Sequence, residues 1–67
     1  MRLLLNGESR EFPEAVKNVA DLLEHLELAG KFVAVEVNQQ LVPRAQHATH
    51  LLHDGDRVEA VTFVGGG

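Results

Sequence analysis

Length, composition and charge restrict what this chain can be. It has 67 residues, of which 45% are hydrophobic and 24% are charged, and its net charge is −4. At this size we expect a single domain over residues 1–67, with a small core. The sequence has no cysteine, which excludes a disulfide framework, a cysteine-ligated zinc site and a cysteine nucleophile.

The charge and hydropathy patterns exclude two classes of partner. Six Lys and Arg residues scattered along an acidic chain form no basic stripe for nucleic acid. No apolar run approaches the about 18 residues that a membrane-spanning helix needs, and we find no secretory signal. The sequence therefore predicts a soluble, cytoplasmic protein that binds neither nucleic acid nor membrane.

The N-terminal segment predicts a β-hairpin. Asn6-Gly7 separates two short β-prone stretches and is a preferred pair for a two-residue hairpin turn. We expect strands near residues 2–6 and 8–12, with Pro13 closing the second strand.

An amphipathic helix follows the hairpin. Its apolar positions recur at i, i+3, i+4 and i+7, which places them on one face: Val19, Leu22, Leu23 and Leu26. Asn18 is a good N-cap, and Asp21 follows it at a spacing like that of a capping box. Gly30 suits the left-handed position that ends many helices.

The second half of the chain predicts extended structure. Alternating valines indicate a strand over residues 32–38 with one buried face. Residues 41–42 predict a brief extended piece, Pro43 could open a helical turn, and a last strand covers residues 57–64. A mixed sheet of four to five strands packed on one main helix accounts for every apolar stripe, so the predicted fold class is α+β.

The last strand carries apolar residues on both faces. Its charged residues should face water, which makes the face of Val58 and Ala60 the buried one. Val61 and Phe63 then lie on the outer face beside the C-terminal glycines, and we predict that they form a docking patch. In the alternative, a bulge turns Phe63 back into the core.

Histidine and hydroxyl side chains predict neither a metal site nor catalysis. His47, His50 and His53 are spaced by three, but no cysteine joins them and the acids that follow belong to a predicted turn. We interpret them as surface histidines and predict no metal. The few hydroxyl side chains show no Ser-His-acid order, so we predict no enzymatic activity for this chain alone.

The sequence ends on three glycines, Gly65, Gly66 and Gly67. They are not a phosphate-binding loop, because such a loop needs a helix after it. Extended glycines reach about 10 Å and can thread a channel that side chains would block. The terminal carboxylate could then be activated by an ATP-using enzyme and attacked by a nucleophile such as a sulfur donor. The residues alone leave a frayed end as the alternative.

Three segments carry a family resemblance: the opening LLLNGE, VAVEVNQQLVPR at residues 33–44, and LLHDGDRVEAVTFVGGG at residues 51–67. They resemble the ThiS family, the sulfur carriers of thiamine thiazole biosynthesis, over essentially the whole chain. The resemblance implies a β-grasp, ubiquitin-like fold. One segment departs from the family, whose members often have an aromatic residue shortly after VPR, where this chain reads AQHATH. We assign no specific role to Arg44.

The resemblance also implies a chemistry for the tail. A ThiF-like adenylyltransferase uses ATP to adenylate the terminal carboxylate, and sulfur from a cysteine desulfurase converts it to a thiocarboxylate. A ThiG-like thiazole synthase then takes the sulfur. By resemblance Gly67 carries the sulfur, Gly66 completes the essential pair, and Gly65 supports the reach of the tail. The chain itself would bind no cofactor, because ATP is used by the activating enzyme.

Other functions stay open on the sequence alone. The small subunit of molybdopterin synthase shares the fold, tail and activation, although NQQLVPR argues against it. A further carrier would deliver sulfur to cysteine or tRNA. From other classes, the chain could be a ubiquitin-like protein modifier, or an interaction module whose tail is idle.

Overall fold

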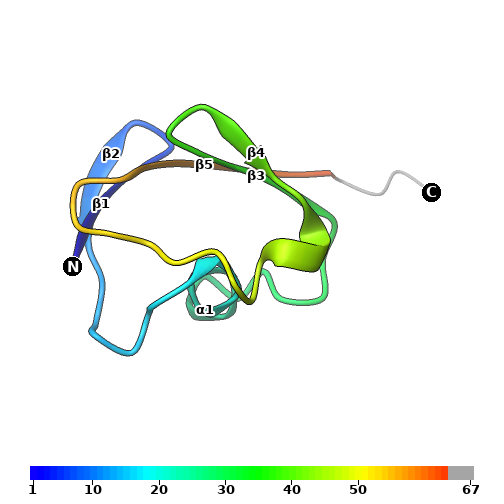
Figure 1. The fold of residues 1–67 in the computed structure, drawn as a ribbon, viewed down its shortest axis with the longest axis horizontal. Coiled ribbons are helices and arrows are strands. Elements are labelled where there is room, and N and C mark those ends of the chain that lie inside the picture. The colour runs from blue at the N-terminus through cyan, green and yellow to red at the C-terminus, as the bar shows by residue number, and fades with distance from the viewer. Residues whose placement is uncertain (64–67) are drawn as a thin grey trace.

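A five-stranded sheet lies against one α-helix in the computed structural model, which describes residues 1–63 (Figure 1). The elements are β1 (Arg2–Leu5), β2 (Glu8–Glu11), α1 (Val19–His25), β3 (Val33–Val37), β4 (Gln40–Val42), the short 3₁₀ helix η1 (Arg44–Gln46) and β5 (Arg57–Thr62). Figure 1 shows the sheet above α1, with β5 running toward the C-terminus. The predicted α+β class, with a mixed sheet on one main helix, is confirmed.

The C-terminal strand occupies the centre of the sheet. The strand order is β2-β1-β5-β3-β4, so β5 lies between two hairpins. It runs parallel to β1 and antiparallel to β3, and both hairpins are antiparallel. The ladder with β1 covers only Arg57 and Val58 at the start of β5, whereas the ladder with β3 continues to Thr62, so β3 holds the end of the strand.

The predicted Asn-Gly turn is present. Asn6 and Gly7 both have positive φ, 49° and 84°, as a two-residue hairpin turn requires. β1 ends at Leu5, one residue earlier than predicted, because Asn6 belongs to the turn. The Asn6 side chain also accepts from the Ala60 N–H at 2.9 Å and donates to the Ala60 carbonyl at 3.2 Å. It thereby ties the first hairpin to β5.

A second hairpin, β3–β4, replaces the isolated extended piece predicted after residue 38. Asn38 and Gln39 form its two-residue turn, with φ of 51° and 69°. β3 is therefore shorter than the predicted strand at residues 32–38. The sequence signal is weak because no glycine occupies this turn. The helical turn predicted after Pro43 is present as η1.

Helix α1 begins as predicted. The Asn18 side chain accepts from the Asp21 N–H at 2.8 Å, and Asp21 in turn accepts from the Lys17 N–H at 3.0 Å. The first contact satisfies a donor that the first turn leaves without a helical partner, and the second fixes the residue just before the N-cap.

The end of α1 differs from the prediction. The Leu28 N–H donates to the Leu23 carbonyl at 2.7 Å, and the Glu27 N–H donates to the Glu24 carbonyl at 3.0 Å. This bond pair is a Schellman motif, and Glu27 takes its left-handed position with φ of 61°. The prediction of Gly30 for that position was wrong. Ending the helix early lets Leu28 pack against the core, and Gly30 lies in a later turn.

The core lies between α1 and the inner face of the sheet. Its twelve buried hydrophobic residues are Leu3, Leu5, Phe12, Val16, Val19, Leu22, Leu23, Val35, Val37, Val42, Leu52 and Val58. Fully burying one such side chain contributes about 1.5–3 kcal/mol relative to leaving it exposed. Phe12 is part of this core, and β2 ends at Glu11 rather than at residue 12. The described residues include no helix with the length and apolar character of a membrane span.

Candidate functional site at the end of the central strand

The end of β5 is the point from which the C-terminal glycines continue. The last described backbone hydrogen bond runs from the Phe63 N–H to the Phe32 carbonyl, at 3.1 Å. β5 itself ends at Thr62, short of the predicted end at residue 64. Gly65, Gly66 and Gly67 lie outside the described residues, as does Val64. Their roles in carrying the cargo stay predictions.

Val61 and Phe63 are exposed, at 55% and 62% of their surface. The register explains this for Val61, because it pairs with Ala34 while the next pair, Val35 and Ala60, turns inward. The predicted exposure is confirmed, and the alternative in which Phe63 returns to the core is wrong. The docking role of the two residues stays a prediction.

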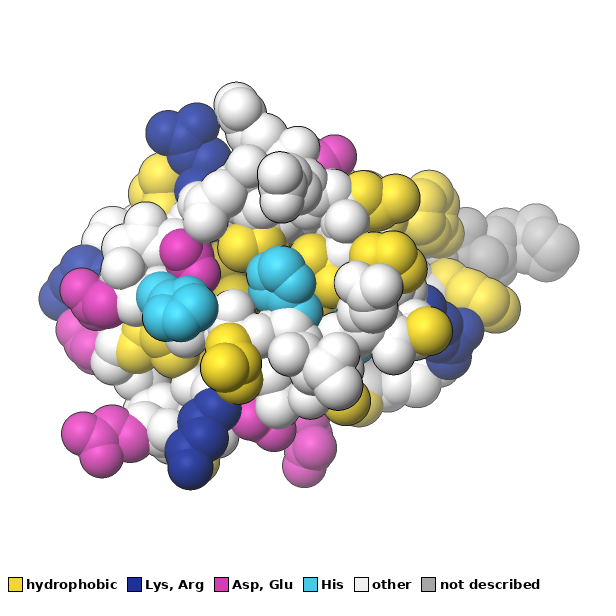
Figure 2. Space-filling view, viewed as in Figure 1, with side chains coloured by type: hydrophobic (Ala, Val, Ile, Leu, Met, Phe, Trp, Pro, Cys, Tyr) yellow, Lys and Arg dark blue, Asp and Glu magenta, His cyan; other side chains and the backbone are white. Residues whose placement is uncertain are grey.

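The exposed apolar surface is larger than the sequence predicted. Phe32 is 70% exposed and Leu41 is 67% exposed, and both come from the β3–β4 half of the sheet. We call Phe32, Leu41, Val61 and Phe63 the outer patch. Figure 2 shows hydrophobic side chains gathered at the end of the molecule where β5 ends. Several large apolar side chains exposed on one small domain are typical of an interaction surface.

The sequence prediction included Val61 and Phe63 but missed Phe32 and Leu41. Phe32 shares the alternation of Ala34 and Glu36, so its outward direction could have been found. Leu41 could not have been placed, because its outward face follows from its pairing with Glu36 across the unpredicted hairpin.

Charged groups border the outer patch. The guanidinium of Arg44 lies over the Phe32 ring, 5.7 Å from the ring centroid, which is a cation–π geometry. On the sheet face, Glu36 of β3 lies directly opposite Glu59 of β5, and both are exposed. The patch therefore has a cation at one side and a pair of anions at another.

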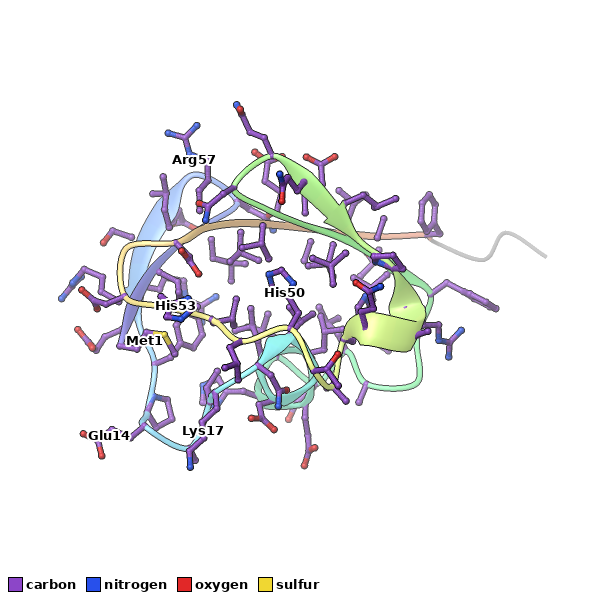
Figure 3. The ribbon with its side chains drawn as sticks, viewed as in Figure 1. Met1, Glu14, Lys17, His50, His53 and Arg57 are labelled. Carbon is purple, nitrogen blue, oxygen red and sulfur yellow. The ribbon has the colours of Figure 1, made fainter. Side chains whose placement is uncertain are left out.

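The three predicted surface histidines do not converge. His47 Nε2 lies 3.2 Å from the Val42 carbonyl oxygen, and His53 Nδ1 lies 3.8 Å from Asp56. Figure 3 shows His50 and His53 well apart along the same loop. Asp56 accepts from the backbone N–H of His53 and from the Asn38 side chain, as a turn residue would. No cluster of three or more His, Asp or Glu within residues 1–63 could hold a metal ion.

The segment that departs from the family pattern, AQHATH, forms η1 and the turn after it. It faces α1 across an open groove of about 280 Å³, lined mainly by small side chains. The groove includes Ala20, Ala29, Ala45 and Ala48, with Arg44 at its edge. His47 of the same segment also lines the groove, and its Nε2 lies 3.2 Å from the Val42 carbonyl oxygen.

The mixed five-stranded sheet packed on one helix defines a β-grasp protein with an apolar patch beside its C-terminus. A family model described as the ThiS family matches residues 3–67. The sulfur carrier protein ThiS of Escherichia coli (strain K12) is 36% identical over 67 residues, covering 100% of both chains. The chain belongs to the ThiS family of sulfur carrier proteins.

Structural comparison agrees with this assignment. The crystal structure of the thiamine biosynthesis protein ThiS from Geobacter metallireducens matches with a TM-score of 0.83 and 36% identity, covering 100% of both chains. A thiazole synthase of Paramagnetospirillum magneticum is 43% identical over 67 residues. That match covers all of this chain but only 20% of the synthase, so the chain spans about a fifth of that relative's length.

Proposed function

We propose that this chain carries sulfur for thiamine biosynthesis on the carboxylate of Gly67. The observation that carries the proposal is the placement of the outer patch at the end of β5, immediately before the terminal glycines. Strand β5 thus connects a docking surface to a glycine tail that can enter a narrow channel. The ThiS and sulfur-carrier names of its relatives support sulfur as the cargo.

The proposed chemistry has two steps. The Gly67 carboxylate attacks the α-phosphate of ATP and releases pyrophosphate, which gives an acyl-adenylate. A sulfur nucleophile at the oxidation level of hydrosulfide then attacks the carbonyl carbon and expels AMP, leaving a thiocarboxylate. Both steps take place in the activating enzyme. This chain supplies the reacting carboxylate and binds no cofactor of its own.

The division of labour between patch and tail follows from free energy. Ordering three tail residues costs about 3–6 kcal/mol on binding. Burying one large apolar side chain contributes about 1.5–3 kcal/mol, and the outer patch offers four, each at least 55% exposed. Docking of Val61, Phe63 and their neighbours can therefore offset the ordering of Gly65, Gly66 and Gly67.

We propose three partners in the cytoplasm: a ThiF-like adenylyltransferase, a cysteine desulfurase that provides the sulfur, and a ThiG-like thiazole synthase that receives it. The match of this whole chain to a fifth of a much longer thiazole synthase, at 43% identity, supports the last of these. Domains that act on one another are often joined in a single polypeptide.

Intact-mass measurement tests the proposal. The chain is incubated with its cognate activating enzyme, ATP and a sulfur source, and we expect one oxygen to be replaced by sulfur. Absence of that replacement with an enzyme shown to adenylate would contradict the carrier function. Offering the loaded chain to a thiazole synthase and to a large molybdopterin synthase subunit then identifies the recipient. Higher-mass covalent adducts in cell extracts would instead indicate a protein modifier.

A further inference from the structure

Arg44 lies near the end of β5, from which the glycine tail continues. It opens η1, directly after Pro43, and its side chain is exposed. Its guanidinium lies 5.7 Å from the centroid of the Phe32 ring, and the Phe32 carbonyl accepts the hydrogen bond from Phe63. The cation is therefore connected through one residue to the last described position before the glycine tail.

The other arginines are placed differently. Arg2 forms an ion pair with Glu11 at 3.0 Å, and Arg10 lies over the Phe12 ring and belongs to β2, the edge strand farthest from β4. Arg57 lies at the far end of β5, remote from the C-terminus (Figure 3). Among residues 1–63, no carboxylate forms an ion pair with Arg44, although acids outnumber Lys and Arg by ten to six.

The surroundings of Arg44 are those of a binding anchor. The cation–π contact with Phe32 favours this position of the guanidinium, and the exposed side chain leaves N–H groups available to a planar acceptor. Arginine and aromatic residues are also the types that dominate binding energy at protein interfaces. A carboxylate fits such an edge with two parallel hydrogen bonds.

We propose that Arg44 is the ionic anchor of the docking surface and that it binds a carboxylate side chain of the activating enzyme. The outer patch packs against an apolar area of the same enzyme. This inference rests on the proposed function and adds to it the chemistry of the partner's surface. Because Arg44 lies near the end of β5, this contact would position the glycine tail where it enters the enzyme. We choose the activating enzyme because it must receive the tail with its carboxylate free.

Equilibrium binding of the full-length chain to the activating enzyme, without ATP, tests the anchor. We expect Arg44→Ala to raise Kd by about tenfold to thirtyfold, as loss of an interface hot spot does. Arg57→Ala is the matched control, because it removes the same charge from the remote end of β5, and we expect less than a twofold change. Equal effects of the two substitutions would overturn the proposal.

Arg44→Lys separates the shape of the guanidinium from its charge. Lysine keeps the charge but lacks the planar fork, so we expect it to bind more weakly than the native chain. Affinity equal to that of the native chain would overturn the two-bond contact. Thermal melts of each variant confirm that the fold is retained.

A competing partner for Arg44 is the chain's own terminal carboxylate. The same measurements on a full-length chain with a Gly67 carboxamide remove that charge. The proposal requires that Arg44→Ala raise Kd by the same factor with either terminus. If Arg44→Ala no longer weakens binding in the carboxamide chain, Arg44 binds the chain's own terminal carboxylate, and the proposal is overturned. Sulfur loading of the native chain reports on the carrier function separately, because the native chain keeps Arg44 whichever carboxylate that residue binds.

Discussion

Glu36 on β3 and Glu59 on β5 lie directly opposite each other on the outer face of the sheet. Both side chains are exposed, and neither forms an ion pair among the residues that the structure describes. Like charges directly opposite each other destabilise an antiparallel pair. The sheet therefore carries an unfavourable pair on the same face as the outer patch.

Replacing one of these glutamates should stabilise the protein. We expect Glu59→Gln to raise the free energy of unfolding by about 0.2–1 kcal/mol, because it removes the cross-strand repulsion. Urea denaturation at low salt measures the change, which should shrink as salt screens the charges. Glu14→Gln is a matched control, since it removes one negative charge from an exposed position outside the sheet. A gain no larger than that of the control would argue against the repulsion.

Phe63→Ala should weaken partner binding while changing stability little. The side chain is 62% exposed, so we expect a loss of less than about 1 kcal/mol in the free energy of unfolding. Phe12→Ala is the contrasting variant, because Phe12 is 3% exposed and its removal should cost about 3–5 kcal/mol. Denaturation and calorimetric binding to the activating enzyme provide the two measurements. Binding as tight as that of the native chain would remove Phe63 from the docking surface.

Glu27→Gly should stabilise the end of α1. Glu27 has φ of 61°, a left-handed conformation that costs L residues about 1–2 kcal/mol and that glycine adopts freely. Part of this gain is lost to the greater flexibility of glycine in the unfolded chain, so we expect a net gain of about 0.5–1 kcal/mol. Glu24→Gly, three residues earlier and inside the helix, should instead destabilise by about 1 kcal/mol. Opposite signs for these two substitutions, read from urea midpoints, are the expected result.

Changes at the terminus should separate chemistry from folding. Deleting Gly67, or adding one residue after it, is expected to abolish sulfur loading because the reacting carboxylate is displaced. The melting temperature should not change, since the buried core lies between Leu3 and Val58. Intact mass after incubation with the activating enzyme, ATP and a sulfur source reports the loading. A displaced terminus that still acquires sulfur would be incompatible with the proposed mechanism.

Local signals were predicted well because their causes are local. Asn6-Gly7 forms its turn because these two residues accept positive φ, and Asn18 caps the helix because its side chain reaches the nearby Asp21 N–H. The alternation of Val58 and Ala60 placed Val61 correctly on the outer face. In each case the interacting groups lie within a few residues of one another.

Features that depend on packing were not predicted. Helix α1 ends at His25, with Glu27 rather than Gly30 in the left-handed position after it, because Leu28 packs against the core and offsets the unfavourable backbone conformation. Asn38 and Gln39 turn without glycine because β4 pairs with β3 beyond them. In both places tertiary contacts override the local preference.

By itself the sequence determined the class of fold, the helix stripe, the first hairpin, the exposed pair Val61 and Phe63, and the family resemblance. Only the tertiary structure decided that the last strand lies in the centre of the sheet, that Phe32 and Arg44 lie beside its end, and that Leu41 is exposed. The physical reason is pairing between segments distant in the chain. Periodicity indicates which face of a strand is buried, whereas the strand order indicates which exposed faces become neighbours.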